Sequence, residues 1–540
     1  MTPIQNNRPE RLRITDQLGR MKSLPDGPEQ YRLLDCGEKN SVLLLGLGPD
    51  PRIPAQIIAN RTDDVLYLEA PELLCQLPSS RQSEIPSHWQ PINSEALSDR
   101  IFRDRTILFY QPNLHLFPDF WAPVLASLKL GPGAACPSLR ERDTIWMPTS
   151  EHSLMARELP LGFANAGLRV RALPEKLLPT DLEAELRQTS PELFFSVNFR
   201  GLDPYGQNYE FLATRKVPVA VWCVDNPFHL LTGIQSGFWR KCILFVTDDW
   251  FIPRLLGLGA QHVVHLPLAA APHFFEPAVD IPPLGTASRT VQDAPGMDDF
   301  LLQPDEHLAN RTVFVGRSSF PGKNAFFAGC TIAPALRQRA LADISRGSRP
   351  DFSWWWDRMR NSPLWPGREV RNVGYAAEEC SQMHRILHLQ AANLGGQLTV
   401  FGDQDWPTLL PGLKDIRPEV DYYGPLPRIY RQARCTLNLT SLLLPHGLTQ
   451  RHFDVWAAGG FLLSDATPGL SIFDQELTRE ISFNSPEDLT ALLNRLEADP
   501  PLSDHLRHAW KNLIRDAHTY DHRIERIMQA LRIHQIPDPV

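Results

Sequence analysis

The chain has 540 residues, which at about 150 residues per domain indicates two to four domains. Its 54 Lys and Arg residues against 62 Asp and Glu residues give a net charge of −8 without any polybasic run. This pattern argues against a general nucleic-acid binder, because such proteins need clustered cations against the phosphates. Hydrophobic residues make up 43% of the chain, which is enough to build packed cores.

The sequence also argues against secretion, membrane insertion and structural zinc. Residues 1–22 lack the apolar segment of a signal peptide, and no apolar run approaches the ~18 residues that cross a bilayer. We therefore expect at most peripheral membrane contact. The eight cysteines form no C-x-x-C pair, which favours a reducing cytoplasm over a zinc site or a disulfide framework. They stand at positions 36, 75, 136, 223, 242, 330, 380 and 435.

The first predicted α/β unit has strands at residues 41–47, 65–70 and 106–112. Gly46 and Gly48 follow the first strand, and Glu69 ends the second, a spacing that could place a dinucleotide or a methyl-donor nucleoside. Pro51 stands at the third glycine of that fingerprint, so we favour a tight strand-to-helix turn.

Two further units alternate strands with helix-length segments, which predicts doubly wound parallel sheets. Their strands are expected at residues 143–150, 191–198, 217–227, 241–250 and 262–269, and then at 311–324, 395–406, 420–427, 433–441 and 459–466. A helix is expected over residues 325–344, and residues 270–308, with six prolines, predict a linker. We therefore expect an N-terminal α/β domain of unknown role at 1–140 and two further α/β domains at 141–305 and 306–540.

Several motifs fit both a functional and a structural explanation. Asp403 and Asp405 match the D-x-D by which one class of sugar transferases holds a divalent metal, but loops after strands are commonly acidic. The pair Asp248-Asp249 has the same ambiguity. Residues 354–356 are three tryptophans that could stack on a sugar or a base, although packing is favoured because neighbouring helical residues point in different directions. No H-E-x-x-H spacing occurs, which argues against a metal hydrolase, and no G-x-S-x-G or Walker pattern occurs either.

The loop that contains Gly316, Arg317 and Lys323 is a candidate diphosphate cradle. Backbone amides and two cations would face phosphate oxygens at the N-terminus of the following helix. Residues 433–467 predict a second part of the site, a strand, a loop, a helix that begins near Thr449, and another strand. Backbone amides of this loop could bind a diphosphate, and Asp454 within the helix could accept hydrogen bonds from a ribose diol.

The stretch Arg451-His452-Phe453-Asp454-Val455-Trp456-Ala457-Ala458-Gly459 resembles the R-x-F-E-x-x-A-x-G segment of GT-B glycosyltransferases. The likeness is strongest to the group related to the spore maturation protein CgeB. Residues 473–493, 518–527, 217–231 and 263–275 resemble the same group, so the likeness covers roughly residues 145–530. It implies a GT-B fold, in which two Rossmann-like doubly wound domains face a cleft, here with an extra N-terminal α/β domain. It also implies sugar transfer from a nucleotide-diphosphate sugar, with no cofactor and no obligatory metal.

The resemblance further implies the donor-binding residues. Arg317 and Lys323 would neutralise the diphosphate, and Asp454 would replace the ribose-binding glutamate with a side chain one methylene shorter. His446 stands where retaining members carry a second glutamate, so the stereochemistry stays open and His446 becomes a catalytic candidate. The donor-binding set is Gly316, Arg317, Lys323, Gly424, Gly447, Thr449, Arg451 and Asp454.

An acceptor-side base is expected from the other domain. Asp225 ends an apolar strand, where open α/β sheets place their ligands, and His229 is the alternative base. Asp225-Asn226-Pro227 also fits a simple turn, and Asn198 and Arg200 are weaker acceptor-side candidates.

The expected function is that of a cytoplasmic glycosyltransferase acting on a glycan or protein acceptor. Two alternatives stay open. One is a catalytically degenerate GT-B scaffold or nucleotide-sugar-binding protein, suggested by His446 and Asp454 at glutamate positions. The other is a nucleotide-dependent enzyme whose chemistry resides near Gly46 and Gly48.

Overall fold

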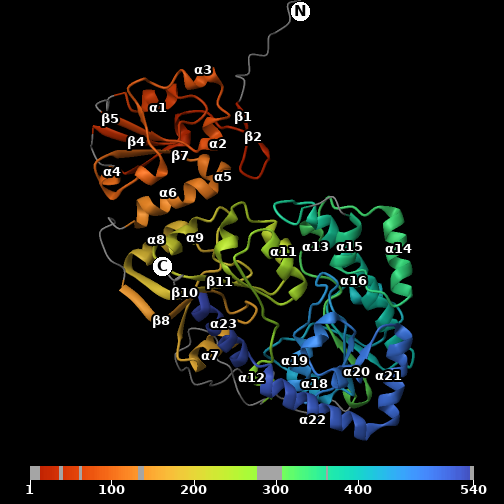
Figure 1. Ribbon diagram of the computed structural model, residues 1–540. Coiled ribbons are helices and arrows are strands. Elements are labelled where there is room, and N and C mark those ends of the chain that lie inside the picture. The colour runs from red at the N-terminus through yellow and green to blue at the C-terminus, as the bar shows by residue number, and fades with distance from the viewer. Residues whose placement is uncertain are drawn as a thin grey trace, which may run out of the picture.

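The computed structural model describes residues 12–35, 40–59, 64–131, 139–275, 307–359 and 363–534. They form three α/β bodies, which we call the front domain (12–131), the first half (139–275) and the second half (307–517) (Figure 1). The linker expected at 270–308 lies mostly outside the described residues, as do Cys36 and Cys136. The six described cysteines are free thiols.

The front domain is built on a mixed sheet of order β3-β7-β4-β5-β6, in which only β3 is antiparallel to its neighbour. The strands are β3 (Tyr31–Asp35), β4 (Ser41–Leu45), β5 (Asp64–Leu68), β6 (Gln90–Pro91) and β7 (Thr106–Tyr110), preceded by the hairpin β1 (Arg13–Thr15) and β2 (Met21–Ser23). The helices are α1 (Arg52–Ile57), α2 (Pro71–Leu74), α3 (Ser79–Gln82), α4 (Asp99–Arg103), α5 (Asn113–Leu116) and α6 (Pro118–Leu130).

The first half is a six-stranded parallel sheet of order β13-β12-β11-β10-β8-β9. Its continuous apolar strands are buried because helices cover both faces. The strands are β8 (Leu139–Pro148), β9 (Arg169–Leu173), β10 (Thr189–Val197), β11 (Val219–Cys223), β12 (Ile243–Val246) and β13 (His262–His265). The helices are α7 (Glu158–Asn165), α8 (Pro179–Gln188), α9 (Gln207–Thr214), α10 (Pro227–Leu231), α11 (Ile252–Gly257) and α12 (Pro272–Phe275).

The second half is a six-stranded parallel sheet of order β16-β15-β14-β17-β18-β19, the strand order of a Rossmann fold. The strands are β14 (Thr312–Val315), β15 (Leu398–Phe401), β16 (Ile416–Arg417), β17 (Cys435–Asn438), β18 (Leu462–Asp465) and β19 (Ser482–Phe483). The helices are α13 (Lys323–Phe326), α14 (Pro334–Ser345), α15 (Phe352–Met359), α16 (Val370–Ala392), α17 (Trp406–Leu409), α18 (Leu426–Gln432), α19 (Arg451–Ala457), α20 (Gln475–Arg479), α21 (Pro486–Ala498) and α22 (Pro500–Ala517).

Two predicted elements of the second half are wrong. The single helix expected over 325–344 is interrupted, because Gly329 has a φ of +79° and Pro334 begins α14. The strand expected over 420–427 is instead a turn followed by α18, and the short strand β16 precedes it. The α/β fold class, with two doubly wound sheets and an additional front domain, is confirmed.

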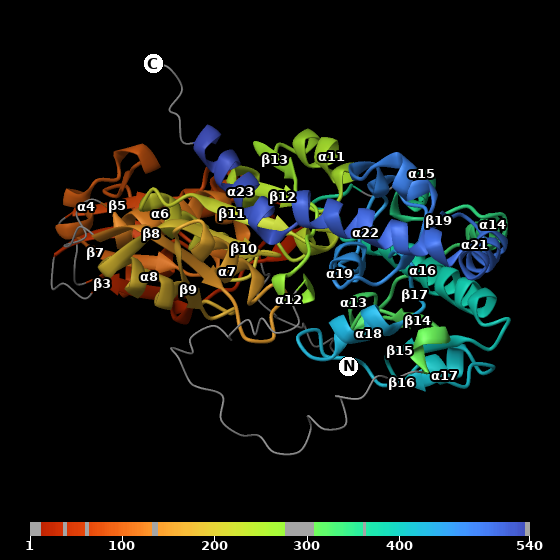
Figure 2. The same cartoon turned by 90° about the horizontal axis from the view of Figure 1, so that it is seen from below.

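The two halves share their hydrophobic interior. One buried cluster joins Trp222 and Phe274 of the first half with Phe453 and Trp510 of the second. After α22, the helix α23 (Tyr520–His534) crosses back onto the first half, where Ile524 packs against Gly162 of α7 (Figures 1 and 2). The end of the second half therefore lies next to the first half.

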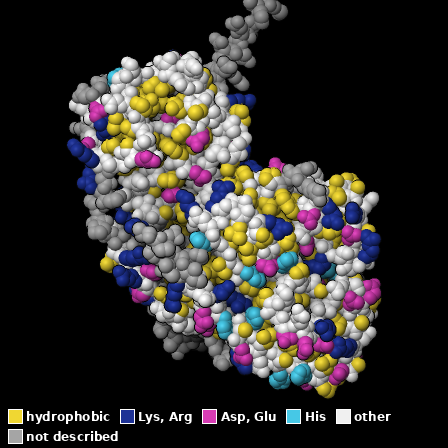
Figure 3. Space-filling model, viewed as in Figure 1, with side chains coloured by type: hydrophobic (Ala, Val, Ile, Leu, Met, Phe, Trp, Pro, Cys, Tyr) yellow, Lys and Arg dark blue, Asp and Glu magenta, His cyan; other side chains and the backbone are white. Residues whose placement is uncertain are grey.

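The surface carries charges of both signs. On the face in Figure 3, Lys and Arg side chains are interspersed with Asp and Glu, unlike the clustered cations of nucleic-acid interfaces. Within the described part of the chain, no helix is long and apolar enough to cross a membrane.

Candidate functional site

A cavity of about 570 Å³, which we call the cleft cavity, lies between the two halves. Gly316 follows β14 and Leu439 follows β17, and both residues line the cavity. The sheet order of the second half reverses between these two strands, and open α/β sheets bind ligands at such a switch point. Across the cavity, Asp225 follows β11 of the first half. The carboxyl ends of both sheets thus face the same space.

The cleft cavity brings together six of the predicted site residues: Asp225, His229, Gly316, Arg317, Thr449 and Arg451. The other five lie outside its lining: Lys323, Gly424, His446, Gly447 and Asp454.

Asp225 presents its carboxyl group to the cleft cavity. Asn198 fixes it, since the Nδ2 of Asn198 donates to Oδ2 of Asp225 at 2.7 Å and its Oδ1 accepts from the backbone of Val224 at 2.9 Å. Asn198 has a φ of 56°, an unusual backbone conformation of the kind that concentrates at functional sites. The carboxyl group is open to the cavity, but the surrounding protein removes much of its solvation and raises its pKa. Arg200, the other weak candidate, pairs with Glu175 at 3.3 Å.

His229 lies in an apolar part of the same wall. The rings of Phe326, Phe327 and Phe352 surround it at 5.3–5.8 Å between centroids. Burial lowers its pKa to about 3, so the imidazole is neutral and a weak base at neutral pH. Its buried Nε2 has no hydrogen-bond partner among the described residues.

Three guanidinium groups line the cleft cavity from the second half. Arg317 is half-exposed and reaches Glu419 at 2.8 Å. Arg451 is held more rigidly, donating to Asn438 Oδ1 at 2.8 Å and to the carbonyl oxygen of Val315 at 2.5 Å. Arg385 of α16 donates to the carbonyl oxygen of Ser318 at 2.6 Å. Together they make the cavity attractive to an anion such as a diphosphate.

Sequence reasoning missed the contribution of α16, which supplies Glu378 and Arg385 to the cavity. A signal was present, because buried residues recur at Val370, Val373, Ala377 and Cys380 with helical spacing and no proline interrupts the stretch. That periodicity predicts an amphipathic helix, although not that it would border a site.

Asp454 is enclosed within the protein and does not border the cleft cavity. It is 1% exposed, and it accepts from Tyr422 Oη at 3.0 Å, Gln450 Nε2 at 3.3 Å and the backbone amide of Ala271 at 3.4 Å. Burial raises its pKa well above the ordinary carboxyl range. In this structure its oxygens are therefore occupied by two side chains of the second half and by one backbone amide of the first half.

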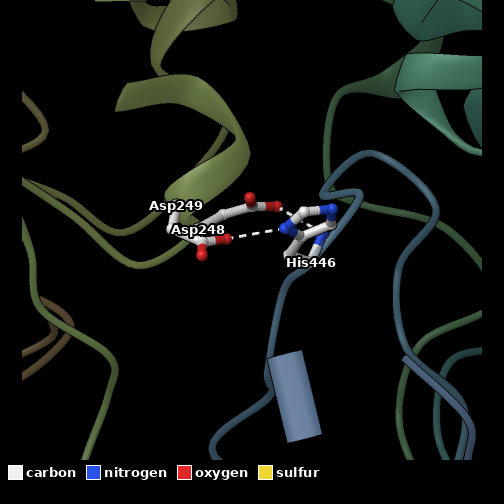
Figure 4. A group of neighbouring side chains, drawn as sticks. All are labelled: Asp248, Asp249 and His446. Atoms are coloured by element: carbon white, nitrogen blue, oxygen red, sulfur yellow. Dashed lines mark hydrogen bonds and ion pairs between the residues drawn. The ribbon is translucent and has the colours of Figure 1, made fainter. Parts of the chain in front are cut away.

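His446 also joins the two halves. Its Nδ1 lies 2.6 Å from Oδ1 of Asp249, and its backbone amide donates to Oδ2 of Asp248 at 2.9 Å (Figure 4). Burial raises the pKa of Asp248 to about 6, against the opposing effect of its amide donors. This trio is the one group among the described residues whose ligand-type atoms lie close enough to hold a metal ion. The pair Asp248-Asp249, whose role was ambiguous in the sequence, therefore binds the loop that precedes α19.

The remaining predicted donor residues lie in turns or are paired. Lys323 begins α13, and its Nζ is 2.8 Å from Glu379 Oε1. The amide of Gly424 donates to the carbonyl oxygen of Asp421 at 3.2 Å. At Gly447 an added Cβ would lie 2.4 Å from Leu444 Cβ, so the tight loop favours glycine there.

The ambiguous motifs outside the cleft make structural contacts. Tyr31 Oη donates to the carbonyl oxygen of Leu47 at 2.7 Å and would lie 2.2 Å from a Cβ on Gly48, so protein atoms fill the glycine turn. Glu69 accepts from the amides of Leu47 and Ala70 at 2.7 and 2.8 Å. Asp403 accepts from the amide of Ser318 at 2.7 Å.

The three tryptophans belong to α15. Trp355 is fully buried, and its two neighbours pack against the same hydrophobic cluster. This is the packing arrangement that the sequence favoured.

Residues 382–529 match the family model described as glycosyl transferase-like, so the second half carries a glycosyl transferase-like domain. No curated protein sequence matches the chain. Among solved structures, HepE of Anabaena in complex with UDP-glucose is similar at 10% identity, over 72% of this chain and 99% of that chain, with a TM-score of 0.43. Trehalose 6-phosphate synthase from Burkholderia multivorans (11%, 73% and 98%, 0.40) and T4 phage β-glucosyltransferase (10%, 72% and 99%, 0.35) are also similar. With TM-scores this low, assignment to the GT-B type rests on the two facing parallel sheets themselves.

Proposed function

We propose that the protein is a GT-B glycosyltransferase that moves a sugar from a nucleoside-diphosphate sugar to a glycan or protein acceptor. The observation that carries this proposal is the cleft cavity, where three guanidinium groups of the second half face a carboxyl group of the first. Kinship with the CgeB-related group and a cytoplasmic location are finer parts of the same proposal, and they rest on the sequence motifs and the scattered cysteines.

The second half would bind the donor. Breaking the bond between sugar and diphosphate places negative charge on the leaving group, and Arg317, Arg385 and Arg451 would stabilise that charge in place. Because side-chain cations supply this stabilisation, the proposed reaction does not require a metal ion.

The first half would activate the acceptor. An acceptor hydroxyl must lose its proton as it attacks the anomeric carbon, and Asp225 is placed to receive that proton. Its raised pKa makes it a stronger base than an ordinary aspartate. His229, with a pKa of about 3, is less suited to this role.

A catalytically degenerate scaffold or nucleotide-sugar-binding protein is the second candidate. The observations that favour it are the enclosed carboxyl group of Asp454 and the engagement of His446 by Asp249, at positions where the related enzymes use glutamates. Such a protein would bind a nucleotide sugar and leave it intact.

The proposal is tested first by thermal unfolding with UDP, GDP, ADP, TDP and CMP, on the wild type and on Arg317→Gln. A nucleotide at 100 times its Kd stabilises the folded protein by about 2.7 kcal/mol, which raises the unfolding temperature measurably. We expect one nucleotide to shift the wild type, and Arg317→Gln to weaken that nucleotide roughly tenfold because a charge-assisted hydrogen bond is lost.

Arg495→Gln is the matched control. Arg495 lies on α21, outside the cleft lining, and forms an exposed ion pair with Glu480. It should bind as the wild type does. If no nucleotide raises the unfolding temperature of the wild type, the proposed donor site is wrong. If a nucleotide sugar binds but releases no nucleoside diphosphate with water as acceptor, the scaffold is favoured.

A further inference from the structure

The helix α16 places one unusual acceptor in the wall of the cleft cavity. Glu378 is 1% exposed and lines the cavity. Its carboxyl group accepts a backbone hydrogen bond from Phe320. Its Oε1 is buried without a hydrogen-bond partner among the described residues. One oxygen of the group is therefore left unsatisfied beside the cavity.

The nearest cation does not satisfy this oxygen. Arg385 Nη1 lies 3.9 Å from Oε1 of Glu378, too far for a hydrogen bond, and it donates to the carbonyl oxygen of Ser318 instead. The other terminal nitrogen of Arg385 donates to Ser381 Oγ at 2.9 Å. A buried carboxyl oxygen without a donor is unfavourable, so a ligand that brings a donor to this point would be favoured there.

The chemistry of that ligand group follows from the charges around it. A diphosphate carries only acceptors, and it would be repelled by a carboxylate, so it cannot satisfy Glu378. A hydroxyl group can donate to Oε1.

We propose that Glu378 binds a hydroxyl group of the sugar that the nucleotide carries, and that Glu378 is a specificity-determining residue of the donor site. This inference rests on the proposed function. The family-model match begins at residue 382, so Glu378 lies outside it. The cations of the cavity would hold the diphosphate while α16 distinguishes a bare nucleotide from a nucleotide sugar.

The test compares each nucleotide with its sugar conjugate by isothermal titration, on the wild type and on Glu378→Gln. The probes are UDP with UDP-glucose, GDP with GDP-mannose, ADP with ADP-glucose and TDP with TDP-glucose. Glutamine keeps the size of the side chain and an acceptor for Phe320 but removes the charge. We expect the affinity for the preferred nucleotide sugar to fall roughly tenfold, because a hydrogen bond to a charged group is lost, and that for its bare nucleotide to change less than twofold.

Deoxy analogues of the preferred sugar sharpen the test. One deoxy position should weaken binding to the wild type and leave binding to Glu378→Gln unchanged, since the missing hydroxyl is the one that Glu378 receives. Glu369→Gln, an exposed residue at the start of the same helix, is the control and should match the wild type.

Three results would overturn the inference. If Glu378→Gln loses affinity for the bare nucleotide and for the nucleotide sugar equally, Glu378 contacts the ribose or maintains the shape of the cavity. If the variant loses affinity for neither ligand, Glu378 has no role in binding. If the wild type binds none of the eight probes, the proposed function itself fails, which is distinguishable because the wild type alone shows it.

Discussion

At the scale of single residues, the edge of the first sheet fixes the side chain of Asp225, the proposed base. The strand β11 ends at Cys223, and the side chain of Asn198 from the end of β10 holds both the backbone of Val224 and the carboxyl group of Asp225. The base is thus fixed by a neighbouring strand end and not by its own loop. Positioning of this kind keeps a reacting group within reach of its substrate before the substrate arrives.

Replacing Asp225 by Asn should separate catalysis from binding. We expect the release of nucleoside diphosphate from the preferred donor to slow by roughly 10²–10⁴-fold, the usual contribution of a general base. The affinity for the donor should change less than twofold, because the bound diphosphate faces the arginines. Asp504→Asn on the exposed face of α22 should behave as the wild type in both measurements. A loss of binding equal to the loss of rate would contradict the assignment of Asp225 as the base.

The pH dependence of the rate follows from the raised pKa of Asp225. A base acts in its ionised form, so the rate should rise with pH as this carboxyl group loses its proton. Because its surroundings raise the pKa, the rise should occur above the usual range of an aspartate. The rate at which nucleoside diphosphate is released from the donor, measured against pH, should show this rise in the wild type. The Asp225→Asn variant should lack it.

The contrast between Asp225 and Asp454 shows what single residues reveal in a sequence. A polar residue that follows an apolar strand lies at the carboxyl edge of a parallel sheet, whatever packs against that sheet. Asp225 obeys this rule and lies in the cleft. Asp454 matched a motif, but its surroundings come from Ala271 and Tyr422, which are far away in the chain. The position of Tyr422 depends on the packing within the second half, and that of Ala271 on how the two halves meet, and no local pattern encodes either.

At the scale of elements, α16 borders the cleft cavity with Glu378 and Arg385. It packs against α10, and Gly374 allows the contact, since a Cβ there would lie 2.0 Å from His229 Nε2. Phenylalanine rings surround the imidazole, so it has little room to move aside. The close approach of α10 and α16 therefore depends on glycine at this position.

Gly374→Ala should destabilise the protein although alanine favours helices. We expect an overpacking cost of about 1–3 kcal/mol, which outweighs the helix gain of up to ~1 kcal/mol. The unfolding midpoint in urea measures the balance. Gly257→Ala is the control, because Gly257 ends α11 with no neighbouring atom within 4 Å of an added Cβ, and it should be neutral or slightly stabilising. An equally stable Gly374→Ala variant would show that His229 can move aside.

Buried strands were the more predictable elements, although the strand expected at 420–427 was wrong. The expected strands at 191–198 and 433–441 correspond to β10 and β17, because continuous apolar runs between turn residues are local signals. The helix expected at 325–344 was misjudged, since Gly329 and Pro334 matter more there than the surrounding apolar residues. The role of α16 could not be predicted, because its cavity-facing side is defined only by contact with α10.

At the scale of the whole molecule, hydrogen bonds at several separate places join the halves. Asn226 of the first half donates to the carbonyl oxygen of Leu443 at 2.9 Å, and His446 meets Asp248 and Asp249. The helix α23, which follows the second half, is held in turn on the first half, because Arg523 donates to the carbonyl oxygens of Pro267 and Leu268 at 2.8 and 3.0 Å. The cleft is therefore bordered by fixed contacts as well as by the shared core.

Ile524→Ala should loosen the first half although the change lies in the last described helix. Ile524 is 1% exposed and packs on Gly162, so its truncation should cost about 2–5 kcal/mol. Hydrogen exchange in α7 and β8 should become faster. Leu394→Ala removes an exposed side chain of the second half and should leave exchange in both elements unchanged. Unaltered exchange in the Ile524→Ala variant would mean that α23 does not stabilise the first half.

The return of α23 to the first half also has a consequence for biosynthesis. Domains generally fold as units while the chain emerges from the ribosome, N-terminal domains first. The first half has all six of its strands once residue 265 is made, but the helix that covers Gly162 and packs on Trp222 is made more than 250 residues later. During that interval an apolar surface of a nearly complete domain stays uncovered, so nascent chains should need a chaperone until α23 emerges.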